Sequence, residues 1–456
     1  MEHKKHKRIE TVLAVCFWLF VWQAASLAVG EELLLVSPFK AAATLASMLL
    51  LPDFWATVAF SSVRIVSGFL AALAAGAALA LLAARVRFVR VLLQPMMVTV
   101  RSVPVASFII LALLWLKNAG NLAVLISFLM VLPIVYANVL AGIGHVDRRL
   151  LDMAAVFRFG RGKRLRYLYL PAVLPDFRAA CSVGIGLCWK SGVAAEVIGI
   201  TAGSIGERLY DAKLLFSTAD LFAWTLVIVL LSLGFEKVFL FALDTMERRL
   251  LRVAPGDSGR TAPGRPETLV LEDITAGYGG EPVLEHLSLR VQAGQALCVM
   301  APSGRGKTTL LHVLLRLLTP QMGRVLPGPQ TFLAAAFQED RLIGALSAAD
   351  NLQLVTALER PALLALLADA GIGREAALRP ADTLSGGQRR RVAVLRALLA
   401  DGASAVVLDE PFKGLDPAAK ARMVELVKRL LAGRALLAVT HDPQDAPDLG
   451  AAVFRL

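Results

Sequence analysis

The sequence predicts two domains of different fold class: an all-α domain of six transmembrane helices, followed by an α/β domain with a phosphate-binding loop. The chain of 456 residues is 57% hydrophobic and only 18% charged, whereas a soluble globular protein carries about a quarter charged residues. Long apolar stretches fill the first 252 residues, and glycine-rich and acidic motifs follow them. This composition excludes an intrinsically disordered chain and disfavours an entirely soluble one.

Six apolar stretches in the first half each approach the ~20 residues that a helix needs to cross a bilayer. They are Ile9–Val29, Ile65–Ala84, Val98–Leu116, Leu122–Gly142, Phe177–Ile200 and Leu221–Leu243. The first follows a basic N-terminus, as in a signal peptide, but it is longer than a typical signal-peptide core and lacks a clean small-residue cleavage site. We therefore expect a retained helix and a transmembrane domain over residues 1–252.

The loops between these stretches differ strongly in basic charge. With the N-terminus placed in the cytoplasm, the cytoplasmic segments carry 18 Lys and Arg residues and the opposite loops carry four. Basic residues accumulate in the cytoplasmic loops of membrane proteins. The sequence therefore predicts a multi-pass protein of the cytoplasmic (inner) membrane, in contact with lipid, with its N-terminus and its second domain in the cytoplasm.

The net charge of +12 belongs almost wholly to this half. Residues 1–252 carry 26 basic and 15 acidic side chains, and residues 253–456 carry 22 and 21. A basic protein can bind nucleic acid, but here the excess lies beside the membrane. We therefore expect no nucleic-acid partner.

Two charged residues, Lys190 and Glu196, interrupt the fifth stretch. A charge at membrane depth is costly and often marks a solute pathway or a buried pair. A structural pair, or side chains that extend to the helix end, are the alternatives. A spacing of six residues is unfavourable for direct contact on one helix face, and the choice stays open at this point.

A segment rich in Pro, Gly and Arg, residues 253–266, is predicted to be a linker. After it, short apolar runs such as Leu297–Met300, Ala405–Leu408 and Leu436–Val439 alternate with helical stretches. This pattern is typical of buried parallel strands. The sequence thus predicts an α/β domain over residues 267–456.

The first of these runs leads into a glycine-rich segment and then an apolar helical stretch. A strand, a glycine-rich loop and a helix form a phosphate cradle, because loop amides and the helix N-terminus face the anion. Gly304 and Gly306 permit close approach, Lys307 would neutralise phosphate charge, and the Thr308 hydroxyl would bind Mg²⁺. The strict pattern has glycine where Ala301 stands.

Three further motifs accompany this loop in a fixed order. Leu384–Gln388 opens an Arg-rich helix, Asp409 and Glu410 end an apolar strand, and His441 ends another. One carboxylate could be linked to Mg²⁺ while the second orients water. Each motif alone could be an ordinary loop or cap, but their joint order and spacing indicate an ATPase.

These motifs make residues 267–456 resemble the nucleotide-binding domain of ABC transporters, which implies ATP and Mg²⁺ as cofactors. The resemblance implies Glu410 as general base, His441 as switch histidine on the γ-phosphate, and Gln338 as the catalytic Q-loop residue that touches Mg²⁺ and water. It implies a metal site at Thr308, Gln338 and Asp409. The residues implied to bind ATP are Tyr278, which would stack on adenine, Ser303, Gly304, Arg305, Gly306, Lys307, Thr308 and Thr309 of the Walker A loop, Ser385, Gly386, Gly387 and Gln388 of the signature motif, and Asp416 of the D-loop.

The departures from the family pattern are Ala301, Arg305 and a short stretch between Lys307 and Gln338, and we expect them to adjust affinity without abolishing hydrolysis. In this family the Walker A loop of one domain and the signature motif of another share each ATP. The resemblance therefore implies a homodimer or a heterodimer with a similar half-transporter.

The first half resembles importer permeases of the nitrate, sulfonate, taurine and bicarbonate class. The resemblance rests on the cytoplasmic loop 147–176, whose Asp152, Ala154, Leu170 and Pro171 match the coupling-loop motif, with Arg158 in place of its glycine. The run WKSGVAAEVIG at residues 189–199 and the length of six helices support it. It implies import of a small anionic solute delivered by an extracytoplasmic solute-binding protein. Composition leaves open whether the loop is a short helix on a partner or a solvated loop at the lipid surface, and it is expected to end in a proline-flanked turn.

Two alternatives remain for the function. An exporter has the same order of membrane domain and ATPase, but it carries long intracellular helices that this sequence lacks. A membrane-anchored ATPase that moves no solute would keep the same ATPase motifs.

Overall fold

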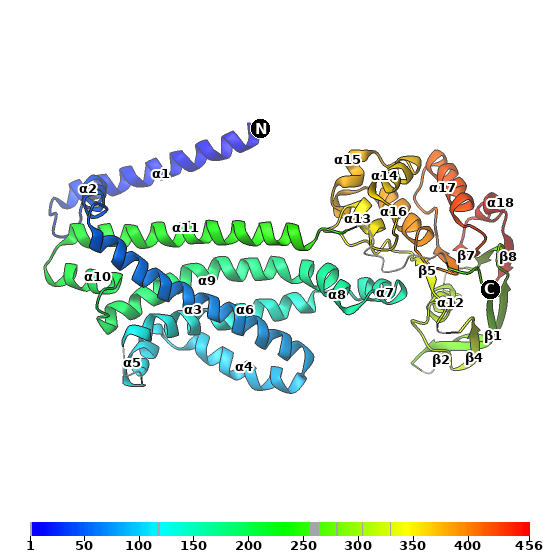
Figure 1. Ribbon diagram of the computed structural model, residues 1–456, viewed down its shortest axis with the longest axis horizontal. Helices are drawn as coiled ribbons and strands as arrows, with labels where there is room; N and C mark the ends of the chain where they lie inside the picture. The colour runs from blue at the N-terminus through cyan, green and yellow to red at the C-terminus, as the bar shows by residue number, and fades with distance from the viewer. Residues whose placement is uncertain (1, 116–118, 255–263, 280, 303, 329) are drawn as a thin grey trace. The chain divides into compact units, whose positions relative to one another are not determined.

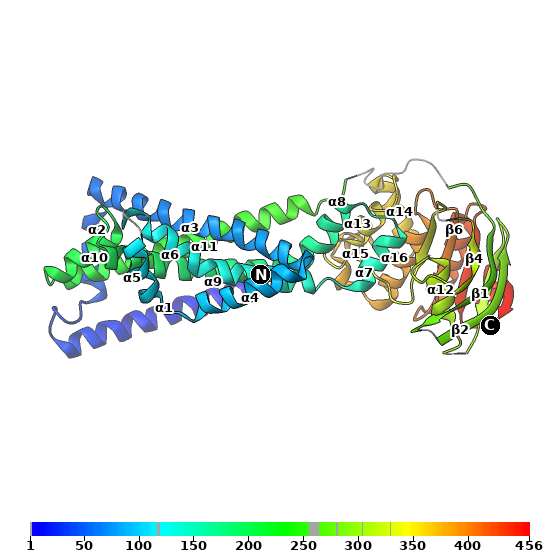
Figure 2. The ribbon, with the colours of Figure 1, turned by 90° about the horizontal axis from the view of Figure 1, so that it is seen from below.

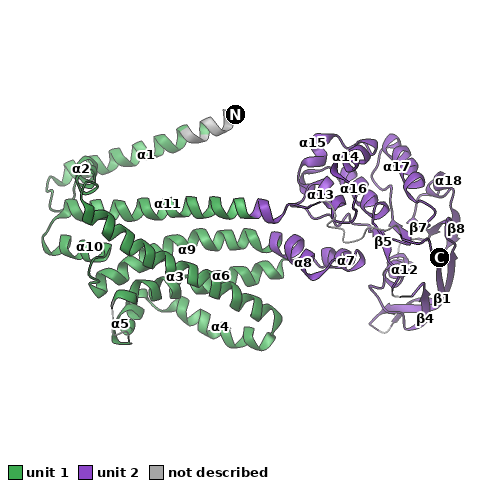
Figure 3. Ribbon diagram, viewed as in Figure 1, with its two compact units in different colours: residues 1–145, 172–246 green, residues 146–171, 247–456 purple. Residues whose placement is uncertain are grey.

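The chain folds into two compact units in a computed structural model that describes residues 2–115, 119–254, 264–279, 281–302, 304–328 and 330–456 (Figure 3). Unit 1 holds residues 1–145 and 172–246, and unit 2 holds residues 146–171 and 247–456. Each unit has buried hydrophobic clusters of its own. The segment 146–171 therefore comes from the membrane half of the sequence but packs with the ATPase half. Most of the expected linker, 255–263, lies outside the described residues.

Unit 1 is built from helices (Figure 1). They are α1 (Glu2–Val29), α2 (Pro38–Met48), α3 (Pro52–Arg85), α4 (Arg87–Ser102), α5 (Val105–Trp115), η1 (Ala119–Asn121), α6 (Leu122–Gly144), α9 (Leu170–Gly199), α10 (Ile205–Leu214) and α11 (Thr218–Leu250). Five helices among the described residues are long and apolar enough to cross a membrane, and α4 with α5 forms a sixth, bent candidate. Four of the six predicted stretches fall within single helices, and a fifth, Phe177–Ile200, ends one residue beyond α9.

The third predicted stretch, Val98–Leu116, is wrong as a single helix. The chain bends by 105° between α4 and α5. Val103, at the break, adopts extended backbone angles because the following Pro104 disfavours a helical conformation at the residue before it and has no N–H to donate.

The helices α3 and α6 pack in parallel at close range. A Cβ added at Gly68 would clash with the carbonyl oxygen of Val124, and one added at Gly76 would lie 3.2 Å from that of Leu132. Residue numbers thus rise along both helices in the same direction. Two parallel neighbours need a return segment between them, and α4 with α5 supplies it. This requirement favours counting the bent pair as one crossing.

Unit 2 is an α/β structure with two sheets (Figure 2). The strands are β1 (Leu269–Tyr278), β2 (Glu281–Val291), β3 (Ala296–Met300), β4 (Met322–Leu326), β5 (Leu333–Ala336), β6 (Ala405–Asp409), β7 (Ala435–Thr440) and β8 (Ala452–Arg455). One sheet is antiparallel in the order β2-β1-β4, and the other is parallel in the order β5-β6-β7-β3-β8. The three strands named from the sequence are confirmed as central members of the parallel sheet.

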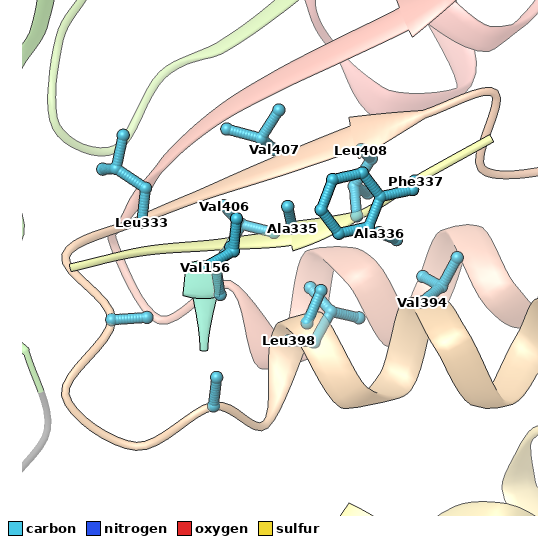
Figure 4. Packing of buried hydrophobic residues seen from close by; sticks show 14 of the residues in the cluster. Val156, Leu333, Ala335, Ala336, Phe337, Val394, Leu398, Val406, Val407 and Leu408 are labelled. Carbon is cyan, nitrogen blue, oxygen red and sulfur yellow. The ribbon is translucent and has the colours of Figure 1, made fainter. Parts of the chain in front are cut away.

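Helices cover the sheets of unit 2, and short ones come from the membrane half. They are α7 (Arg148–Val156), α8 (Arg161–Arg164), η2 (Leu165–Tyr169), α12 (Lys307–Leu314), α13 (Ala348–Gln353), α14 (Arg360–Asp369), α15 (Arg374–Leu378), η3 (Ala381–Thr383), α16 (Gly386–Leu398), α17 (Pro417–Leu430) and α18 (Asp445–Leu449). Figure 4 shows Val156 of α7 beside Leu333 and Ala335 of β5, with Leu398 of α16 on the same side of the strand. The segment 146–171 is therefore part of the core of unit 2.

This packing decides between the two expectations for the loop 147–176, a short helix on a partner or a solvated loop. The loop contains a short helix, α7, whose first turn is capped by the Asp147 carboxylate at 2.8 Å from the Arg149 amide. The expected turn at its end is wrong, because the chain stays helical from Arg161 to Gly199 through the π-helical turn η2. Pro171 follows η2 inside this continuous helical run, and its missing N–H removes one backbone donor to the preceding turn without ending the helix.

We predict that Gly68→Ala destabilises unit 1, because the added methyl group meets the backbone of α6, which cannot rotate away. Overpacking of this kind costs about 1–3 kcal/mol. The midpoint of thermal unfolding of the purified chain in detergent should fall by several degrees.

Gly186→Ala on α9 is the matched control, since a Cβ there meets nothing within 4 Å. Equal unfolding midpoints for the two variants would contradict the close packing of α3 on α6.

Candidate functional site

The glycine-rich loop joins β3 to α12. Gly304 and Gly306 have φ angles of 83° and 86°, in the left-handed region that favours glycine. The Lys307 ammonium donates to the carbonyl oxygens of Ala301 and Pro302 at 2.6 and 3.0 Å. The lysine therefore folds back over its own loop. Ala301, which replaces the expected glycine, takes part through its backbone alone.

The hydroxyl-bearing residues after the lysine differ in exposure. Thr308 is exposed at the start of α12, whereas Thr309 is buried. Arg305 is exposed in the loop, and Ser303 lies outside the described residues. Thr308 is thus the hydroxyl that could reach a metal ion beside the loop.

Asp409, Glu410 and His441 lie at the carboxyl ends of neighbouring strands. Asp409 ends β6, and His441 follows β7, which pairs in parallel with both β6 and β3. The carboxyl ends of parallel neighbours share one edge of the sheet. The phosphate-binding loop after β3 and these three side chains therefore gather at that edge.

The Glu410 carboxylate has two partners here. The His441 ring nitrogen Nδ1 lies 3.1 Å from its Oε1, and the Lys413 ammonium lies 2.9 Å from its Oε2. The carboxylate is mostly buried, and its residue has a φ of 47°, a strained conformation that surrounding structure must hold. Burial raises the pKa of Glu410, but the hydrogen bonds from Lys413 and His441 outweigh it and leave the pKa below its ordinary value.

The pKa values of the two adjacent carboxyl groups, Asp409 and Glu410, are shifted in opposite directions. Burial raises the pKa of Asp409 to about 6, against the pull of the nearby Arg390 guanidinium. Titratable pairs whose environments separate their pKa values are typical of reactive sites. Here Glu410 is the group whose charged form its hydrogen-bond partners stabilise.

A buried arginine, Arg390, bonds to both the end of β6 and the segment that follows β5. The Arg390 guanidinium of α16 donates to the carbonyl oxygens of Phe337 and Asp409 and lies 3.3 Å from the Asp340 carboxylate. Gln338, between two of these partners, is exposed just after β5. The strand end at Asp409 and the loop that carries Gln338 are therefore held by one side chain.

The signature motif lies at the N-terminus of α16. Ser385 and Gln388 form a capping box there, and Gly387 packs against Gly414 and Leu415. Asp416 caps α17 by accepting from the Ala419 amide at 2.9 Å. Among the described residues no hydrogen bond joins the signature motif to the glycine-rich loop, so one chain does not bring the two together by itself.

A lysine and three carboxylates connect α17 to the segment after His441. The Lys420 ammonium lies 2.8 Å from Asp442, 2.7 Å from Asp445 and 3.2 Å from Asp448. Burial lowers the pKa of Lys420, but the three hydrogen-bonded carboxylates outweigh it and raise the pKa above the ordinary value. This network fixes the loop that presents His441.

Tyr278 lies at the end of β1 and is about half exposed. Its hydroxyl lies 2.8 Å from Nδ1 of His312 on α12. Burial, followed by the charge of Arg341, lowers the pKa of His312. The aromatic ring is thereby held beside the helix that follows the phosphate loop.

Residues 146–171, which belong to unit 2, make contacts close to Gln338. The Asp152 carboxylate lies 3.6 Å from the Arg341 guanidinium, which also lies 3.4 Å from the Glu339 carboxylate. Ala154, in the same helix, is fully buried. Two of the expected coupling residues are thus brought to the segment that follows β5.

Arg158 takes the conformation of the glycine that it replaces, with a φ of 52°. Its guanidinium donates to the carbonyl oxygens of Gln330 and Thr331 at 2.9 and 2.6 Å and lies 5.7 Å from the Phe332 ring centre. Arg158 therefore keeps the tight turn that a glycine would form and adds two hydrogen bonds to the segment before β5. Leu170 and Pro171 begin α9 and make no such contact among the described residues.

Lys190 and Glu196 do not pair. Glu196 is fully buried and accepts from the Ser61 hydroxyl at 2.8 Å and the Gly206 amide at 3.3 Å. Lys190 is exposed on another face of α9. The unfavourable spacing seen in the sequence is confirmed, and the two residues have separate environments.

The sequence analysis missed Lys413, Arg390 and Lys420. Lys413 had a usable signal, since it follows Glu410 by one turn. The partners of the other two are 19 to 53 residues away, and one sequence contains no sign of such contacts.

The donor set fits Mg²⁺. This ion prefers carboxylate and hydroxyl oxygens together with substrate phosphates rather than an all-protein cage. Asp409 and Thr308 supply such oxygens, and no cluster of three or more acidic, His or Cys residues that could form a complete cage occurs in the described part of the chain. The ion would therefore be bound jointly with the phosphates.

Comparison with known proteins matches both halves. Residues 284–413 match the family described as "ABC transporter", and residues 72–252 match "Binding-protein-dependent transport system inner membrane component". The chain is 39% identical over 194 residues to the aliphatic sulfonates import ATP-binding protein SsuB 1 of Rhodococcus jostii (strain RHA1), covering 41% of this chain and 78% of that protein. It is 36% identical over 211 residues to the thiamine import ATP-binding protein ThiQ of Mesorhizobium japonicum, covering 42% and 82%.

We predict that Lys420→Met loosens the His441 loop, because three carboxylates would lose their shared cation. Removing one partner of a buried ion pair costs about 3–5 kcal/mol, and the partial exposure of Asp442 and Asp448 places this case at the lower end. The thermal midpoint and the ATP turnover of the purified chain should both fall.

Lys428→Met on the exposed face of the same helix is the matched control and should behave as the parent. An unchanged thermal midpoint in Lys420→Met would show that the network contributes nothing.

Proposed function

The chain belongs to the ABC transporter family and joins an importer-type permease to its ATPase, and from this premise we propose that it imports a small anionic solute at the expense of ATP. The observation that carries the proposal is the packing of permease residues 146–171 into the core of the ATPase unit. Asp152 there pairs with Arg341, three residues after Gln338. A change at the nucleotide can thus reach the permease through direct contact.

Hydrolysis follows from the residues at the sheet edge. Lys307 would exchange the carbonyl oxygens of its own loop for phosphate oxygens, since an ammonium gains more from an anion than from neutral acceptors. Mg²⁺, when bound, neutralises phosphate charge, with Asp409 and Thr308 holding it and Gln338 beside it. Glu410, ionised at neutral pH, would orient the attacking water and accept its proton. His441 would stabilise charge on the γ-phosphate.

Two chains would complete two ATP sites. Each chain has one phosphate loop and one signature motif, and they are not joined by hydrogen bonds among the described residues. We therefore propose a homodimer, or a pair with a similar half-transporter, in which each ATP lies between Lys307 of one chain and Ser385 of the other.

Features of the membrane half support the proposed direction of transport and the proposed membrane location. The chain is a multi-pass membrane protein, and the basic loops support a position in the cytoplasmic membrane with both ends inside. The similarity to an aliphatic sulfonates importer component and the match to binding-protein-dependent permeases support import from an extracytoplasmic solute-binding protein. The short segment 146–171 disfavours an exporter, which needs long intracellular helices.

We predict that Glu410→Gln abolishes steady-state ATP hydrolysis but retains ATP binding. The amide is isosteric with the carboxylate but cannot accept the proton of the attacking water. Turnover should fall by about 10²–10⁴-fold, the usual contribution of general-base catalysis, while nucleotide binding stays within twofold of the parent.

Turnover at the parental rate in Glu410→Gln would assign the base to another residue. Glu425→Gln, at an exposed position of α17, is the control and should leave both quantities unchanged.

We predict that a solute-binding protein carrying its anion accelerates ATP turnover of the chain in proteoliposomes. Binding proteins should be tested with and without an aliphatic sulfonate. A turnover rate that no binding protein or solute alters would favour a membrane-anchored ATPase over an importer.

A further inference from the structure

We propose that a cavity in unit 1, at the break between α4 and α5, binds a small organic anion through Arg101 and Asn138. The inference rests on the proposed import function, because it assigns a place where the solute is held on its way through the permease. The cavity has a volume of about 420 Å³, within the range of about 300–1,000 Å³ typical of ligand sites. Helices α4, α5, α6 and α9 all contribute to its wall.

The charge of the wall is positive. Arg101 is the one charged residue among the described residues that line the cavity, and Asn138 supplies an amide. The Arg101 guanidinium has no hydrogen bond or ion pair within the described part of the chain. The Asn138 amide donates one hydrogen to the Ile134 carbonyl at 2.8 Å, which leaves its second hydrogen for a ligand.

The position of Arg101 along α4 argues against a simple surface role. It lies fourteen residues after Arg87, where α4 begins, or about 21 Å along the helix at 1.5 Å per residue. The hydrocarbon core is about 30 Å thick. An unpaired guanidinium that far along a membrane helix is costly and by default indicates a functional site.

The start of α5, after the break between α4 and α5, adds positive electrostatic potential to the cavity wall. Helix α5 begins at Val105, which lines the cavity. The amides of a helical first turn have no acceptor within the helix and carry partial positive charge. Non-helical backbone at membrane depth occurs where it is buried in protein or lines a cavity, as this segment does.

Lys190 extends the basic surface. Val183 and Leu187 line the cavity from α9, and Lys190 follows on the same face one turn later. It is exposed, whereas the acidic Glu196 faces Ser61 and Gly206 elsewhere in the bundle. Lys190 therefore adds a second cation on this face of α9, one turn beyond the cavity-lining Leu187. The Glu236 carboxylate, by contrast, is bonded to the hydroxyl of Ser182, the neighbour of Val183.

The apolar part of the wall specifies the rest of the ligand. Met130, Ile134, Val183 and Leu187 supply side chains without charge. A guanidinium, an amide and an apolar wall together fit an anionic head group with a short hydrocarbon tail, such as a short alkyl sulfonate, better than an organic cation.

The test uses the full chain in lipid nanodiscs and ethanesulfonate as the probe, with binding measured by isothermal titration calorimetry. The parent should bind ethanesulfonate and should not bind ethylammonium, which has a similar tail and the opposite charge. Arg101→Gln should weaken ethanesulfonate binding by about tenfold or more, as expected for loss of a hydrogen bond to a charged group. Arg101→Lys, which keeps the charge, should retain part of the affinity.

Arg90→Gln is the matched control, because Arg90 lies three turns before Arg101 on the same exposed face of α4 but outside the cavity. It should bind as the parent does. A parental affinity in a folded Arg101→Gln variant would overturn the proposal, and so would equal binding of ethanesulfonate and ethylammonium by the parent.

Should Arg101→Gln fail to fold, Asn138→Ala decides the matter, with weaker binding expected and unchanged binding contrary to the proposal. ATP turnover of the same parent preparation is measured separately. Turnover that a loaded binding protein stimulates, without ethanesulfonate binding in the cavity, would remove this site and leave the import function standing.

Discussion

The packing of permease residues 146–171 against the parallel sheet is the contact on which the rest of the account depends. Val156, Phe157 and Phe159 are buried in the same cluster as β5 and α16. Burying such side chains contributes about 1.5–3 kcal/mol each, far more than the exposed ion pairs at the rim of the contact. The segment is thus bound mainly by apolar burial, and Arg158 and Asp152 set its orientation.

The same sheet organises the chemistry. Parallel strands bring the phosphate loop, Asp409, Glu410 and His441 to one edge, although they are far apart in sequence. Arg390 links that edge to the loop after β5, which meets the permease segment. The proposed nucleotide site at the edge and the helix α7 are therefore connected by a short series of packed and hydrogen-bonded groups.

Sequence alone predicted the features that depend on local pattern. The strands at Leu297, Ala405 and Leu436, the Arg-rich helix opened by Leu384–Gln388 and five of the apolar spans each have a periodic or motif signature. The bend at Pro104 also had a local signal, but continuous hydropathy across it suggested one helix. The partners of Arg390 and Lys420, the docking of Val156 and the cavity at Arg101 depend on contacts between distant segments, which hydropathy and spacing do not contain.

The most direct test of the account is the number of solute molecules imported per ATP hydrolysed by Phe157→Ala in proteoliposomes. The ring of Phe157 lies beside that of Phe332, with centroids 6.3 Å apart. Phe157 is more than a hundred positions from every residue that we expect to bind ATP. The account predicts that the number of solute molecules imported per ATP falls severalfold while ATP hydrolysis continues. The reason is that residues 146–171 lose part of their apolar packing against the sheet. A parental ratio in the folded variant would contradict the claim that this contact transmits the work of ATP to the permease.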